Sequence, residues 1–144
     1  MTKFIFTSIL FCFVTLVFAQ SEEMSMTPLA PDAVLKGFIR DYGNEKVSWK
    51  ETEDSYEGTF KLIKMPATVW YDSTGHRMKL VVDIKESQLP SIALSYLDRN
   101  YPKAKVDRAQ KWTDDKKVST FQADIKLGAE TKTLMFTSRG DLIN

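Results

Sequence analysis

The sequence contains an internal repeat, and this repeat constrains the fold more than any other feature. Residues 31–42 align with residues 90–101 at a constant offset of 59, with a proline, a leucine and a tyrosine at matching positions. The offset then becomes 65, and alternating, mostly apolar residues of 56–71 meet similar residues of 121–136. The extra residues of the second copy lie between Asp107 and Val118, where a hairpin absorbs an insertion. This internal repeat predicts two similar structural units packed side by side.

Each copy begins with a helix signal. Pro31 and Pro90 suit a first helical turn, and apolar residues follow at helical spacing. Gly43 and Pro102 end the two predicted helices. The expected core-facing positions are Leu35, Phe38, Ile39 and Tyr42 in the first copy and Leu94, Leu97 and Tyr101 in the second.

After each helix the apolar period changes to two, which is typical of strands with one buried face. This alternation covers 56–63 and 121–127, and further strands are predicted over 67–71, 78–84 and 132–136, with tight turns at 72–75, 127–130 and 138–141. We therefore predict an α+β fold in which two tandem helix-plus-four-strand repeats form one antiparallel sheet with the helices on one face. We expect one shared core that contains Leu35, Phe60, Val69, Leu94, Ile125 and Phe136.

The N-terminus has the layout of a secretory signal peptide. Lys3 precedes the apolar run 4–18, and Val17 and Ala19 place short side chains before a cut ahead of Gln20. We favour cleavage over an uncleaved anchor because this run is shorter than the roughly 20 apolar residues that span a membrane. The predicted organisation is a signal peptide over 1–19, a flexible spacer over 20–30 and a domain over 31–144, with repeats at 31–86 and 88–144. The expected location is periplasmic or secreted.

Removal of the leader changes the composition in two respects. Lys3 is removed with the leader, so the expected mature chain has 19 basic and 19 acidic residues and a formal net charge of zero. This balance gives no electrostatic reason to expect nucleic acid or an anionic membrane as a partner, and we expect no stable membrane insertion after cleavage. Cys12, the only cysteine, also leaves, so the core alone must stabilise the mature chain.

Catalytic and metal-binding patterns are sparse. His76 is the only histidine, which with no mature cysteine excludes Cys–His pairs and zinc sites built on several such ligands. We interpret His76 as an exposed turn residue. The sequence has no phosphate loop or dinucleotide fingerprint. Acidic residues near 51–57 and at Asp114 and Asp115 indicate solvated turn charge, with a calcium site as the alternative. We expect no catalytic residue, no metal and no cofactor.

Trp70 is the most informative candidate for binding. Strand alternation directs Val69 and Tyr71 into the core and Trp70 to the opposite face, where Met135 takes the equivalent place in the second copy. Tryptophan and methionine are enriched in protein interfaces. Two interpretations stay open for Trp70, a partner anchor or a side chain covered by residues 20–29 or by a hairpin. Trp49 is assigned to the core, whereas Trp112 suits a rim contact or a local core equally well.

Several short motifs in a fixed order resemble the PepSY-like proteins, which are also described as beta-lactamase-inhibitor-like. The resemblance covers residues 31–144 and rests on Leu89-Pro90, the helix ending in Tyr101-Pro102, strand 121–125 and the turn 136–140, with Trp49, Tyr56, Phe60 and 71–75 in the first copy. It implies a secreted or envelope bacterial protein without catalytic activity that binds or inhibits another protein.

These observations predict a periplasmic or secreted, non-catalytic protein-binding module. The unidentified partner, an envelope or secreted protein, would bind the open sheet face, and inhibition of an envelope enzyme is one form of this function. The candidate protein-binding residues are Trp70, Met135, Trp112, Lys61, Asp114 and Asp115. The alternative is a small-ligand carrier or small enzyme with a pocket at the repeat junction, which a large closed pocket would favour.

Overall fold

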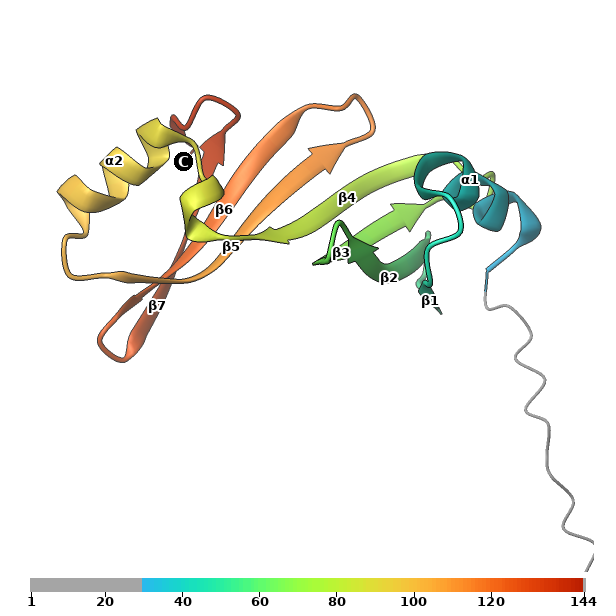
Figure 1. The fold of residues 1–144 in the computed structure, drawn as a ribbon, viewed down its shortest axis with the longest axis horizontal. Coiled ribbons are helices and arrows are strands. Elements are labelled where there is room, and N and C mark those ends of the chain that lie inside the picture. Colours follow the sequence, from blue (N-terminus) through green and yellow to red (C-terminus); the bar gives the residue numbers. More distant parts are fainter. Residues whose placement is uncertain (1–29, 144) are drawn as a thin grey trace, which may run out of the picture.

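The computed structural model describes residues 30–143 of the chain. The predicted signal peptide, residues 20–29 of the predicted spacer and Asn144 lie outside the described residues. The structure has two α-helices, α1 (Asp32–Tyr42) and α2 (Ser91–Asn100), and a short 3₁₀ helix, η1 (Glu86–Gln88). Figure 1 shows the strands, which are β1 (Ser48–Glu51), β2 (Tyr56–Leu62), β3 (Met65–Tyr71), β4 (Arg77–Ile84), β5 (Lys105–Asp114), β6 (Ser119–Leu127), β7 (Glu130–Thr137) and β8 (Leu142–Ile143).

The eight strands form one antiparallel sheet in which spatial order follows chain order from β1 to β8. Helix α1 precedes the first four strands and α2 the last four, so the predicted α+β fold is confirmed. The two halves join where β4 pairs with β5, with Val82 opposite Lys111. The last strand has only two residues, which leaves most of the outer edge of β7 unpaired within residues 30–143. Neither helix in this part of the chain is long and apolar enough to span a membrane.

Both helices pack on the same face of the sheet, but they cover its opposite ends (Figure 1). The buried residues consequently form two clusters, and the expectation of one shared core is wrong. Phe60 and Val69 belong to the cluster beneath α1, whereas Ile125 and Phe136 belong to the cluster beneath α2. Among residues 30–143, only the half-buried Ile84 packs against both clusters. Eight strands about 4.8 Å apart span roughly 34 Å, and two helices about 10 Å wide cannot cover that width.

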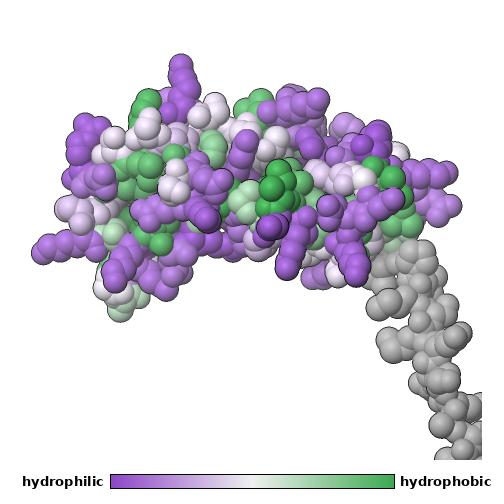
Figure 2. All heavy atoms as spheres, in the orientation of Figure 1, coloured by the Kyte–Doolittle hydropathy of each residue, from purple (hydrophilic) through white to green (hydrophobic). Residues whose placement is uncertain are grey.

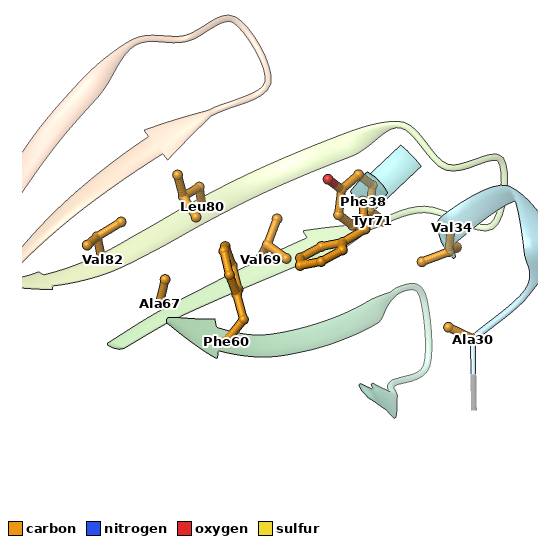
Figure 3. Packing of buried hydrophobic residues seen from close by; sticks show 9 residues of the cluster. All are labelled: Ala30, Val34, Phe38, Phe60, Ala67, Val69, Tyr71, Leu80 and Val82. Carbon is orange, nitrogen blue, oxygen red and sulfur yellow. The ribbon is translucent and has the colours of Figure 1, made fainter. Parts of the chain in front are cut away.

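Figure 3 shows the first cluster, in which the Phe38 ring of α1 packs among Phe60 and Tyr71 of the sheet. The Phe38 ring lies 5.0 Å from Phe60 in an edge-on arrangement and 5.6 Å from Trp49, so Trp49 has the core-facing position predicted for it. Ala30 also packs here with 3% of its surface exposed, although the sequence places it in the spacer. The folded unit therefore includes at least one residue before Pro31.

Each helix rests on the turn that follows the third strand of its half. Gly75 approaches the Ala33 backbone of α1, and Gly140 approaches the Ala93 backbone of α2, in both cases too closely for a Cβ atom. Gly37 faces the same contact from the helix side, because a Cβ there would lie 2.5 Å from the Gly75 carbonyl oxygen. The buried face of α1 is therefore Val34, Gly37 and Phe38. Ile39, predicted as core-facing, is 52% exposed, so this assignment is wrong.

A buried tyrosine links the sheet to the end of α1. Tyr71 is fully buried, and its hydroxyl donates a 2.7 Å hydrogen bond to Asp41 Oδ2. Burial, reinforced by this contact with the Asp41 carboxylate, raises the pKa of Tyr71, so the hydroxyl keeps its proton. Partial burial disfavours the Asp41 charge, but the hydrogen bonds from Arg40 and Tyr71 outweigh it and lower the Asp41 pKa.

Candidate functional site

The surface opposite the helices is the predicted open face. Trp70 of β3 lies on it between Glu57 of β2 and Lys79 of β4. Its neighbours Val69 and Tyr71 are fully buried on the helix side, so the predicted orientation of Trp70 is confirmed. Trp70 itself is half-buried and belongs to neither core cluster. We call this surface the open face.

Two tryptophans flank one lysine near the junction of the two halves. Trp112 of β5 pairs with Val81 of β4, and Trp70 of β3 pairs with Lys79 of β4, so the two indoles lie on either side of β4. The Lys79 ammonium is 3.9 Å from the centroid of the Trp70 ring and 5.0 Å from that of Trp112. These are cation–π distances. We call Trp70, Lys79 and Trp112 the tryptophan–lysine cluster.

The cluster stands beside a closely packed strip of the open face. Val81 and Gln110 are each only 5% exposed, although no helix covers this side of the sheet within residues 30–143. Gln110 Nε2 donates a 2.7 Å hydrogen bond to Asp83 Oδ1, which also accepts from Arg108. The open face thus combines an apolar and aromatic centre with a hydrogen-bonded polar margin, an arrangement typical of binding surfaces.

The indole nitrogen of Trp112 is buried and has no hydrogen-bond partner among the described residues. An unpaired buried donor costs about 1 to 3 kcal/mol, and the core residue Trp49 has the same unpaired indole nitrogen, so this feature is not specific to the open face. A shallow hollow of about 150 Å³ adjoins the ring, between Lys79, Thr120 and the β5–β6 hairpin.

The structure does not bring all predicted binding residues together. Met135 faces the same side, but it lies on β7 between Gln122 and Ile143, about 19 Å from β3 at normal strand spacing. Lys61 is exposed on β2 opposite Pro66. Among the predicted binding residues, only Trp112 shares a neighbour with Trp70, namely Lys79.

Asp114 and Asp115 belong to the β5–β6 turn. Asp114 Oδ1 accepts a 2.7 Å hydrogen bond from the Val118 backbone, which closes the turn, and Asp115 is exposed. Asp72 closes the corresponding turn of β3–β4 in the same way, and hydrogen bonds from Thr74 and from the His76 backbone lower its pKa. His76 is exposed there, as predicted. Among residues 30–143, no three His, Cys, Asp or Glu side chains gather as a metal site.

One irregularity explains why the sequence leaves the position of Trp112 open. The β5–β6 register shifts between Val106 and Arg108, so Asp107 is an extra, bulged residue. Unbroken alternation from Val106, which packs on the second core, would direct Trp112 to the helix side. The bulge reverses the faces of all later β5 residues and places Trp112 on the open face.

Comparison with protein families and with curated proteins finds no match to this chain. The fold, however, resembles several solved structures. A DUF2874 family protein from Bacteroides uniformis ATCC 8492 superposes with a TM-score of 0.73 at 18% sequence identity, over 80% of this chain and 87% of that chain. A BLIP-like protein from Bacteroides fragilis NCTC 9343 superposes with a TM-score of 0.70 at 17% identity, over 80% and 84%.

A proposed periplasmic protein from Bacteroides eggerthii DSM 20697 gives a TM-score of 0.74 at 13% identity, over 80% of this chain and 86% of that chain. At these identities the likeness shows the fold alone. The fold therefore fits the beta-lactamase-inhibitor-like part of the resemblance seen in the sequence. None of these three structures is described as PepSY-like, so that part of the resemblance remains a prediction.

Proposed function

We propose that this protein is a periplasmic or secreted, non-catalytic binding module whose protein partner docks on the open face, with the tryptophan–lysine cluster near the centre of the contact. The observation that carries this proposal is the half-buried pair Trp70 and Trp112 around Lys79, on a face that no helix covers within residues 30–143. A core role does not explain the pair, because both rings point away from the two buried clusters.

The physical properties of the cluster suit a binding anchor. Tryptophan side chains bury large area on contact and dominate many interfaces, where truncation commonly costs 2 kcal/mol or more. Lys79 orders both rings before binding, which lowers the entropy that association must offset. Within residues 30–143 Lys79 has no salt-bridge partner, so its ammonium is free to donate a hydrogen bond to a carboxylate of the partner.

Substitution of Trp70 by alanine tests the proposal. We expect Trp70→Ala to reduce capture of the partner from an envelope extract at least about tenfold, or roughly 1.4 kcal/mol, with the melting temperature almost unchanged. Trp112→Ala should have a similar effect, because the two rings share Lys79. The measurement is quantitative mass spectrometry of proteins retained by each immobilised variant.

Lys126→Ala is the matched control, since Lys126 is exposed on β6 and its salt bridge with Asp107 is solvent-accessible. It should change capture less than either tryptophan variant. Full capture by Trp70→Ala would contradict the proposed contact. A large fall in melting temperature would instead assign Trp70 a structural role and move the search to the helices or the β5–β6 hairpin.

The leader sequence and the proposed periplasmic neighbour both support the location. We expect the protein recovered from the envelope fraction to begin at Gln20, and intact-mass measurement checks this. A mass that includes residues 1–19 would contradict signal cleavage. The BLIP-like neighbour supports inhibition as the consequence of binding, and an activity assay of the captured partner, with and without this protein, tests that finer proposal.

A further inference from the structure

A groove lies on the helix side of the sheet, at the junction of the two halves. Helices α1 and α2 cover the ends of the sheet, so part of β4 and β5 between them has no helix above it (Figure 1). The groove has a volume of about 350 Å³, within the roughly 300 to 1,000 Å³ typical of small-molecule sites. It is an open groove rather than a closed pocket. Its principal lining residues are Leu62, Ile63, Leu80, Val82, Lys111 and Phe121.

The groove carries one charge. Lys111 rises from β5 between Val82 of β4 and Phe121 of β6, which are its register partners on the helix side. No acidic side chain lines the groove, and among residues 30–143 Lys111 forms neither a salt bridge nor a side-chain hydrogen bond. A groove with a single ammonium and otherwise apolar walls is complementary to a ligand that has one anionic group and an apolar chain.

The groove wall contains a strained residue. Ile63 and Lys64 connect β2 to β3 with φ values of 50° and 67°. Two-residue turns with positive φ favour Asn-Gly or Asp-Gly, and a β-branched residue in this region is a genuine outlier. The Ile63 side chain is 83% exposed, so burial of this side chain does not offset the backbone strain. Figure 2 shows an apolar patch at this hairpin tip, surrounded by hydrophilic residues. Strain of this kind, at an exposed apolar side chain, is typical of binding sites.

We propose that this junction groove binds a single-chain aliphatic carboxylate, with the acyl chain along Leu62, Ile63 and Val82 and the carboxylate on the Lys111 ammonium. The ion pair supplies the head-group preference, and burial of the chain supplies the affinity. The groove lies on the face opposite the tryptophan–lysine cluster, so this inference is independent of the proposed protein contact.

Calorimetric titration with dodecanoate, dodecanol and dodecyltrimethylammonium, each below its micelle concentration, tests the proposal. We expect saturable one-to-one binding of dodecanoate, at least about tenfold tighter than that of the cationic analogue. Lys111→Gln should weaken dodecanoate binding at least about threefold and leave dodecanol binding unchanged. Lys116→Gln, an exposed lysine in the β5–β6 turn, is the matched control and should change neither affinity.

Ile63→Asn separates binding from folding. Asparagine tolerates positive φ better than isoleucine, so we expect this variant to be at least as stable as the native protein while its dodecanoate affinity falls about fivefold. Equal affinity for the three head groups, unsaturable binding, or unchanged affinity in both Lys111→Gln and Ile63→Asn would overturn the proposal. Trp70→Ala should bind dodecanoate normally, so failure here is distinguishable from failure of the protein-binding function.

Discussion

Gly75→Ala is expected to lower the free energy of unfolding by about 2 to 5 kcal/mol. Two effects add at this position. Gly75 has a φ of 80°, which an L-residue with a side chain adopts only at a cost of about 1 to 2 kcal/mol. In addition, the new Cβ would lie only 2.7 Å from the Ala33 carbonyl carbon of α1. Because this neighbour is helix backbone, the turn and the helix must move apart and the first core cluster loosens.

Gly128→Ala is the matched control for this substitution. Gly128 also has a positive φ, 65°, but a Cβ there has no atom within 4 Å. Its cost should therefore be the conformational part alone, about 1 to 2 kcal/mol. Urea denaturation of both variants measures the difference. Equal costs would contradict the close contact between the β3–β4 turn and α1.

Phe60→Ala is expected to cost about 3 to 5 kcal/mol of stability. Phe60 is 4% exposed, and its ring centroid lies 5.0 Å from that of Phe38 and 4.8 Å from that of Tyr42. The truncation removes the side chain that joins the C-terminal half of α1 to the sheet and leaves a cavity between rigid aromatic rings. Denaturant melts give the magnitude, and a loss below about 1 kcal/mol would contradict the strand register of β2.

Ile39→Ala provides the comparison on the helix itself. Ile39 lies one residue after Phe38 but is 52% exposed, so its truncation should change stability by no more than about 0.5 kcal/mol. Helical periodicity alone assigns Ile39 to the core beside Phe38. A cost similar to that of Phe60→Ala would show that α1 presents the face predicted from periodicity rather than the face that contains Gly37.

Much of the local structure could be predicted because it depends on neighbours in the chain. Alternation over β2 and β3 predicts Phe60, Val69 and Tyr71 as buried and Trp70 as outward, and all four positions are confirmed. Helix limits follow from Pro31 and Gly43, since a proline and a left-handed glycine act within one turn. The candidate site could be predicted to the same extent, through Trp70 but without its neighbours across the sheet.

The sequence by itself determined the two helices, the strand faces over regular stretches and the absence of cysteine pairs and of histidine pairs, since the chain has one residue of each type. Only the tertiary structure decided which strands meet between the halves, and thus that Trp112 faces Trp70 across Lys79. Tertiary packing also decided the bulge at Asp107 and the separation of the buried residues into two cores. Periodicity records which way a side chain points along one strand, whereas a bulge and a helix position depend on how twisted strands and helices pack, which no single segment encodes.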